Sequence, residues 1–154
     1  MSDPQDFAEP LQKLPTGMPR RYAEYRPVHR QQSTPPPTNV GGYDELTAHF
    51  ESNGVQLPRS VNGLAAVDAF IDSNSDKTSI SAFVRPIGMF YGDVLTHAIA
   101  GAHWEVVQAE YPLVRVTTKT AVDVIRVAIR RLAAPAPTLV QNYSHVMELV
   151  RHER

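Results

Sequence analysis

The sequence predicts one small α+β domain, residues 43–154, preceded by a proline-rich arm, residues 1–42. Eight of the 13 prolines fall in the arm, and proline can neither continue a helix nor donate to a sheet. Downstream, several segments repeat apolar residues every three or four positions, as amphipathic helices do. Two short segments rich in β-branched residues indicate an antiparallel hairpin, so we expect helices packed around a short sheet.

The arm is expected to be extended or disordered, because its composition cannot bury a core. Residues 20–30 differ from the rest of it, since four arginines and two tyrosines stand there against one glutamate. Guanidinium groups bind carboxylates and phosphates, and tyrosine rings stack. The expected partner-binding residues are Arg20, Arg21, Tyr22, Tyr25, Arg26 and Arg30. A solvated basic linker is the alternative interpretation.

The longest apolar, helix-periodic run spans residues 80–101 and leads to Trp104, the only tryptophan. We expect this segment to be the central helix of the domain. Pro86 predicts either a kink or a new helix start. Gly88 and Gly92 lie four residues apart and so share one helix face, which indicates the close approach of another backbone or of a ligand. Of the two, helix packing is the favoured interpretation.

Other helices are expected on both sides of this run. Before it, the spacing predicts helices over residues 44–53 and 60–72 and a polar loop over 73–79. After the hairpin, Thr120 with Asp123 resembles a capping box that opens a helix, although residues 121–124 could instead form a third strand.

The hairpin itself is expected over residues 103–109 and 113–118, with Trp104 and Val106 on one face and Val114 and Val116 on one face of the partner strand. A last helix is expected from Thr138, with residues 151–154 frayed.

Arg126 and Arg130 lie four residues apart on the helix after the hairpin, and Arg131 follows them directly. Together they predict a basic strip that contacts an acidic protein or a nucleic acid. The alternative is a solvated helix face.

Composition excludes several classes of function. The net charge is −1, and there is no cysteine for a disulfide, a thiolate zinc site or a nucleophile. No serine elbow or phosphate-binding loop is present, so we expect no catalytic residue and no cofactor. The first ten residues lack the features of a signal peptide, and charged residues interrupt the run at 80–101. We therefore expect a cytoplasmic protein without a membrane span.

One metal-binding arrangement is conceivable. Asp93 and His97 are four residues apart on the central helix, and His103 follows it, so a carboxylate and two imidazoles could hold a divalent ion. A simple surface pair between Asp93 and His97 is the more common arrangement, and we expect no metal.

Residues 87–95, I-G-M-F-Y-G-D-V-L, are followed by G-A-H-W-E-V at 101–106 and P-L-V-R-V at 112–116. In these segments the chain resembles uncharacterised bacterial domains, common in actinobacteria, in which a G-x-x-x-G-[DE]-x-[IVL] helix leads to G-x-x-W and a short sheet. Residues 63–68 resemble the upstream helix of the same family, so the resemblance covers roughly 60–150. It implies a fold without an assigned activity and transfers no catalytic residue.

These observations predict a non-enzymatic protein-interaction module or accessory subunit that contacts a larger partner through the arm and the exposed arginines. One alternative is a small metal- or ligand-dependent enzyme with a site beside Asp93 and His97. The other is a nucleic-acid accessory protein that uses the arginines of the arm.

Overall fold

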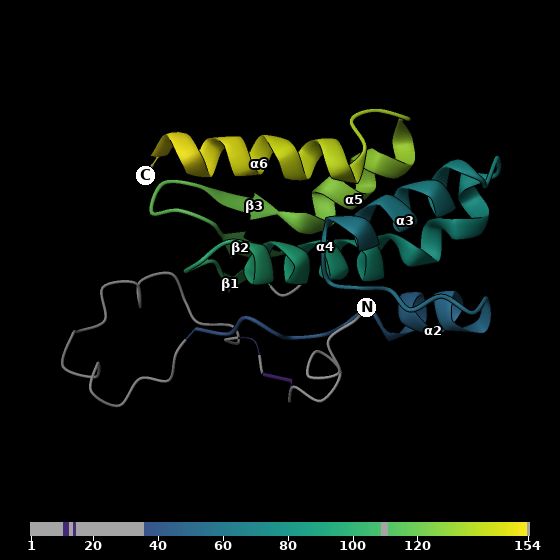
Figure 1. Cartoon of the computed structure of the whole chain (residues 1–154), viewed down its shortest axis with the longest axis horizontal. Helices are drawn as coiled ribbons and strands as arrows, with labels where there is room; N and C mark the ends of the chain where they lie inside the picture. Colours follow the sequence, from purple (N-terminus) through teal and green to yellow (C-terminus); the bar gives the residue numbers. More distant parts are fainter. Residues whose placement is uncertain (1–10, 13, 15–35, 109–110, 154) are drawn as a thin grey trace.

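The domain combines helices with a three-stranded antiparallel sheet, which confirms the predicted α+β class (Figure 1). The computed structural model describes residues 11–12, 14, 36–108 and 111–153. The predicted partner-binding residues of the arm, 20–30, lie outside this part of the chain. The elements in chain order are α2 Asp44–Ser52, α3 Val61–Asp72, the 3₁₀ helix η3 Lys77–Phe83, α4 Val84–Ala98, β1 His103–Gln108, β2 Tyr111–Arg115, β3 Ala121–Asp123, α5 Val124–Ala133 and α6 Leu139–Glu153.

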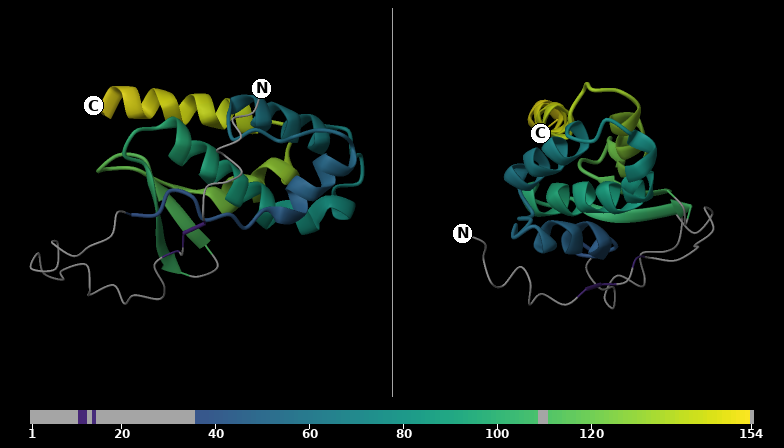
Figure 2. Two further views of the ribbon diagram at one scale, coloured as in Figure 1. Left: turned by 60° about the horizontal axis from the view of Figure 1, so that its bottom comes forward. Right: turned by 90° about the vertical axis from the view of Figure 1, so that its right-hand side faces the viewer.

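Helix α4 lies at the centre of the domain, as its apolar spacing predicts. Figures 1 and 2 show α6 on one side of the molecule and α2 on the opposite side, with α4 between them. The sheet has the order β1, β2, β3. Trp104 of β1 pairs with Val114 of β2, both are buried, and β1 and β2 contact α4. The predicted hairpin and its inward face at these two residues are therefore confirmed.

Two features of α4 decide how closely its neighbours approach. The helix begins at Val84, so Pro86 stands in its first turn, where a missing N–H leaves no hydrogen bond unmade. A Cβ atom on Gly88 would lie 2.9 Å from the carbonyl oxygen of Val124, and one on Gly92 would lie 2.2 Å from Cη2 of Trp104. The two glycines therefore serve packing against α5 and the indole ring, which confirms the favoured interpretation.

The segment after the hairpin combines the two alternatives of the sequence. A short strand ends at Asp123, and α5 starts at the next residue. The side chain of Asp123 accepts a hydrogen bond from the backbone N–H of Arg126 at 3.0 Å, so Asp123 is itself the N-cap of the helix. The expected capping box with Thr120 is wrong, because the Thr120 hydroxyl donates instead to Glu153.

Two further boundaries differ from the prediction. Part of the expected loop at 73–79 forms the start of η3, because the side chain of Asp76 caps it by accepting from Thr78 N–H at 3.0 Å. At the other end of the chain, α6 continues to Glu153, since the hydroxyls of Thr117 and Thr120 hold the Glu153 carboxylate.

The largest difference concerns the end of the arm. Pro37, Asn39 and Gly41 are buried, so residues 36–43, which we call the strap, belong to the folded domain. The boundary expected at Gly42 was placed too late in the chain, because composition does not reveal which backbone groups of a proline-rich segment find partners. Among the helices of the described residues, none has both the length and the apolar character to cross a membrane.

Candidate protein-interaction site

The strap crosses α4 and reaches the edge strand of the sheet. The carbonyl oxygen of Pro37 accepts a hydrogen bond from the backbone N–H of Trp104 at 2.9 Å. One residue further on, the carbonyl oxygen of Thr38 accepts from the hydroxyl of Thr96 on α4 at 2.7 Å. The strap therefore uses its own carbonyl groups to satisfy donors of β1 and α4, as an added edge segment does.

Leu11 and Gln12 of the arm contact the strap. The backbone N–H of Gln12 donates to the carbonyl of Asn39 at 2.8 Å. The side-chain oxygen of Gln12 accepts from the N–H groups of Thr38 and Asn39 at 2.7 and 3.1 Å. Leu11 lies against Gly41, where a Cβ atom would be 3.1 Å from Cδ1 of the leucine. We call this arrangement the clasp.

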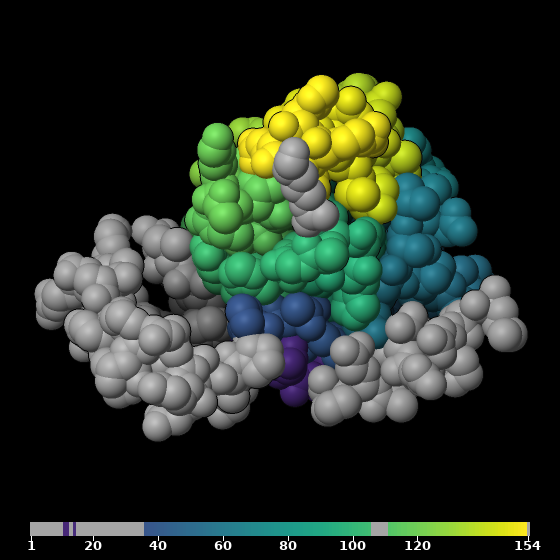
Figure 3. Space-filling model, turned by 60° about the vertical axis from the view of Figure 1, so that its left-hand side comes forward, coloured from purple at the N-terminus to yellow at the C-terminus, as the bar shows by residue number. Residues whose placement is uncertain are grey.

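Space-filling spheres show residues 11, 12 and 14 in purple against the blue strap (Figure 3). The clasp joins Gln12 to Thr38, two residues that are 26 positions apart in the sequence. The predicted partner-binding residues 20–30 fall within this stretch of sequence. The residues on both sides of this stretch, Gln12 and Thr38, are thus attached to the domain, which the sequence did not reveal.

A buried polar network around Asp93 fixes the end of the strap at Tyr43. The Asp93 carboxylate is fully buried, and it accepts hydrogen bonds from the Tyr43 hydroxyl at 2.8 Å and from the Trp104 indole N–H at 3.1 Å. Burial raises the pKa of Asp93 above its ordinary value, although these two donors oppose that shift. Burial, and then the negative charge of Asp93, likewise raise the pKa of Tyr43.

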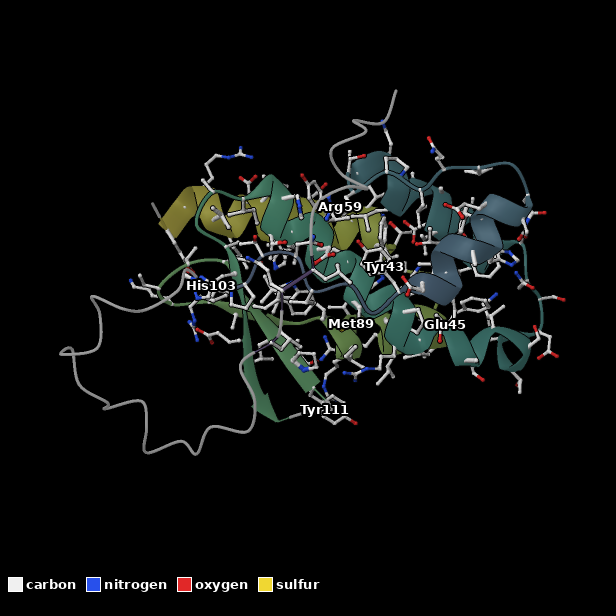
Figure 4. All side chains as sticks on the ribbon, turned by 90° about the horizontal axis from the view of Figure 1, so that it is seen from below. Tyr43, Glu45, Arg59, Met89, His103 and Tyr111 are labelled. Atoms are coloured by element: carbon white, nitrogen blue, oxygen red, sulfur yellow. The ribbon has the colours of Figure 1, made fainter. Side chains whose placement is uncertain are left out.

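Arg59 connects this network to the clasp. Its Nη1 donates to the side-chain oxygen of Asn39 at 2.9 Å, and its positive charge opposes the upward shifts in the pKa values of Asp93 and Tyr43. Figure 4 shows Tyr43 and Arg59 near each other. The position of the strap is therefore fixed by charged and polar side chains from α4, the strap and the segment before α3, in addition to apolar packing.

Asp93, His97 and His103 are not arranged to bind a metal ion. The Asp93 carboxylate faces Tyr43 and Trp104, while Nδ1 of His97 lies 2.7 Å from the Asp93 backbone carbonyl and Nδ1 of His103 lies 3.0 Å from the carbonyl of Gly101. Across the described part of the chain, no three histidine or acidic side chains are grouped so that they could hold a metal. The expected surface pair of Asp93 and His97 is also wrong, because Asp93 is buried.

The three arginines of α5 are divided between the surface and the core. Arg126 and Arg130 are exposed, as expected. Arg131 is 2% exposed, and it donates to Asp68 at 2.8 Å and to Asp72 at 2.7 Å. The prediction of Arg131 as a surface partner-binding residue is therefore wrong, since it lies about 100° around the helix axis from Arg130, on the inner face of α5.

Asp68 also explains why Arg131 is needed inside. The Asp68 carboxylate accepts the backbone N–H groups of Leu139 and Val140 at 2.9 and 3.1 Å, so it caps the start of α6. Arg131 neutralises that buried acid and thereby ties α3, α5 and α6 together. Arg131 therefore stabilises the packing of these helices. Arg126 and Arg130 are the arginines of α5 that are exposed and can contact a partner.

A hollow of about 300 Å³ lies between the end of α6 and the sheet, lined by Ala100, Gly101, His103, Arg115, Val116, Thr117, Thr118 and Glu153. Its charged groups already have partners within the protein. Arg115 donates to both carboxylate oxygens of Glu105 at 2.9 and 3.2 Å. Hydrogen bonds from Thr117 and Thr120 lower the pKa of Glu153. We therefore infer that the residues lining this hollow attach α6 to the rest of the domain and do not bind a ligand.

The fold and the clasp together define a small α+β domain that holds its own N-terminal segment across a central helix. The chain belongs to DUF6278, a family of unknown function whose model matches residues 39–149. The match begins within the strap and covers all the helices and strands named above, except for the last residues of α6. It confirms the resemblance to an uncharacterised domain family. Comparisons with curated proteins and with solved structures gave no match.

Proposed function

We propose that this protein is a non-enzymatic interaction module, an accessory subunit in the cytoplasm that contacts a larger protein through its arm and through the exposed arginines of α5. The observation that carries the proposal is the clasp between Gln12 and Thr38 and Asn39. It places both ends of a basic, tyrosine-containing stretch at one point of a folded domain.

A double attachment favours binding for a physical reason. Tyr25 is 13 residues from both Gln12 and Thr38, and a chain of that length spans at most roughly 45 Å. A chain closed at both ends also has fewer conformations to lose on binding than a free tail of the same length. The arm and α5 can then contact one partner together, and each contact raises the effective concentration of the other.

The chemistry of the arm favours an acidic protein surface. Arginine forks pair with carboxylates in two-pronged geometry, and tyrosine supplies apolar area with one polar group. In proteins, such contacts bind most tightly where they are shielded from water. The net charge of −1 supplies no general attraction to nucleic acid, so a local contact is the arrangement that the composition supports.

The test is a quantitative affinity purification of the full-length chain from its own cells. The arm variant replaces Arg20, Arg21, Arg26 and Arg30 with glutamine. The control replaces two exposed basic residues elsewhere, Lys119 and Arg151, with glutamine. We expect the arm variant to lose a co-purifying protein that the wild type and the control retain.

Two results would contradict the proposal. One is an unchanged set of co-purifying proteins with the arm variant. The other is a set that disappears after nuclease treatment, with binding of single-stranded RNA by the purified wild type that weakens steeply with salt. That second result would assign the arm to nucleic acid.

A further inference from the structure

The outer face of α5 carries one continuous exposed stripe. Its members recur at helical spacing and are Arg126, Ile129, Arg130 and Ala133. Ile129 stands between the two arginines along this stripe, and 43% of its surface is exposed. The neighbouring positions Ile125, Ala128 and Arg131 are buried, so they do not extend the stripe. A large apolar side chain is thus displayed between two cations.

The two arginines of the stripe have donors to spare. Arg126 meets one acid within the described residues, Asp123, and Nε of Arg126 lies 3.7 Å from that carboxylate. The other oxygen of Asp123 already caps α5. Arg130 has no ion-pair partner in the part of the chain that the structure describes. This contrasts with Arg115 and Arg131, whose guanidinium groups are each held by acids of the domain.

We propose that this α5 stripe binds an acidic, amphipathic segment of the partner protein. Carboxylates of that segment pair with Arg126 and Arg130, and an apolar side chain covers Ile129. Because the arginines are one helical turn apart, the carboxylates that match them are spaced by about one turn of a helix, roughly 6 Å. This inference rests on the proposed function, since it names the chemistry of the surface that the same partner presents.

Charge complementarity selects this occupant over the alternatives. A second copy of the chain would bring the same arginines toward one another, and like charges in contact oppose association. A nucleic-acid backbone would pair with the arginines but would leave Ile129 against phosphates. An acidic segment with an apolar residue satisfies both features of the stripe.

The test measures binding of a fluorescent 16-residue helix-forming peptide that carries glutamate pairs four residues apart and a row of leucines. The protein is the full-length arm variant, so that the arginines of the arm do not contribute. We expect Arg126→Glu with Arg130→Glu to weaken binding about tenfold or more. A peptide with lysine in place of glutamate should restore binding to that double variant.

Ile129→Ser should weaken binding about fivefold while leaving its salt dependence unchanged, because it removes apolar contact only. Lys119→Glu with Arg151→Glu, which makes the same charge change at two exposed residues outside α5, is the matched control and should leave binding unchanged. Circular dichroism of each variant verifies that the fold is intact.

Unchanged affinity in the double α5 variant, or failure of the charge-swapped peptide to bind it, would overturn the inference. The purification with the arm variant does not depend on this peptide. A failure of the α5 inference is therefore distinguishable from a failure of the proposed function. The chain's own residues 2–9 contain Asp3, Asp6, Phe7 and Glu9. Tighter peptide binding after their removal would identify them as the occupant and would also overturn the inference.

Discussion

The indole N–H of Trp104 donates to the Asp93 carboxylate at 3.1 Å, in the interior of the domain. The backbone N–H of the same tryptophan donates to Pro37 of the strap. One residue therefore links the sheet, the central helix and the segment that carries the arm. Because these contacts are shared, the strap is expected to unfold with the core and not before it.

The pH dependence of stability follows from Asp93. Burial raises its pKa in the folded protein above the unfolded value of about 3.9, so the folded state holds the proton to higher pH. The contribution of Asp93 to stability is thus complete below pH of about 4 and is lost as the pH rises through the folded pKa.

An asparagine at position 93 cannot titrate, so the Asp93→Asn variant lacks this loss. We expect its free energy of unfolding, relative to the wild type, to increase as the pH is raised from about 4 and then to level off. Urea denaturation of both proteins between pH 4 and 8 measures the difference, and the other acids cancel in the comparison. A difference that is constant over this range would show that Asp93 does not titrate as expected.

Gly92 is expected to resist substitution because the ring of Trp104 occupies the space of a side chain. Alanine is the better helix former by about 1 kcal/mol, but overpacking costs roughly 1–3 kcal/mol. We therefore expect Gly92→Ala to lower the free energy of unfolding. In a double-mutant cycle with Trp104→Phe, the smaller ring should make the alanine less costly. Strictly additive effects would mean that the two residues do not press on each other.

Arg131 is expected to stabilise the fold and not to bind a partner. Arg131→Met should lower the free energy of unfolding by about 3 kcal/mol, because it leaves the buried Asp68 carboxylate without its cation. The same change at the exposed Arg130 should cost no more than about 0.5 kcal/mol. Chemical denaturation measures the free energy of unfolding of both variants. An equal decrease in the two would argue against the assignment of Arg131 to the core.

The sequence predicts local features of this fold better than long-range ones. The central helix and the hairpin are encoded in apolar spacing that any short window reveals. Arg131 was misplaced because its partner Asp68 is 63 residues away, although its position three residues after the buried Ala128 was a signal for the inner face. The clasp had no such signal, since the side chain of Gln12 binds backbone groups 26 and 27 residues further on.

The clasp makes a prediction that is independent of any partner. Gln12→Ala removes the oxygen that accepts from the amides of Thr38 and Asn39. We expect hydrogen exchange at these two amides to accelerate, while the midpoint of global unfolding changes little because the bonds lie near the surface. Replacement of Gln141, which is exposed on α6, is the control and should leave both amides protected. Unaltered exchange in Gln12→Ala would mean that the clasp does not hold in solution.

The stretch between Gln12 and Thr38 is proposed to contact a protein partner. The most direct test of this contact places a photo-crosslinking amino acid at Tyr25 in the full-length chain in its own cells, with the exposed Ser144 of α6 as the control position. We expect a discrete protein adduct from position 25 that is absent from position 144 and that is lost in the arm variant. Adducts to nucleic acid alone, or the same adducts from both positions, would contradict it.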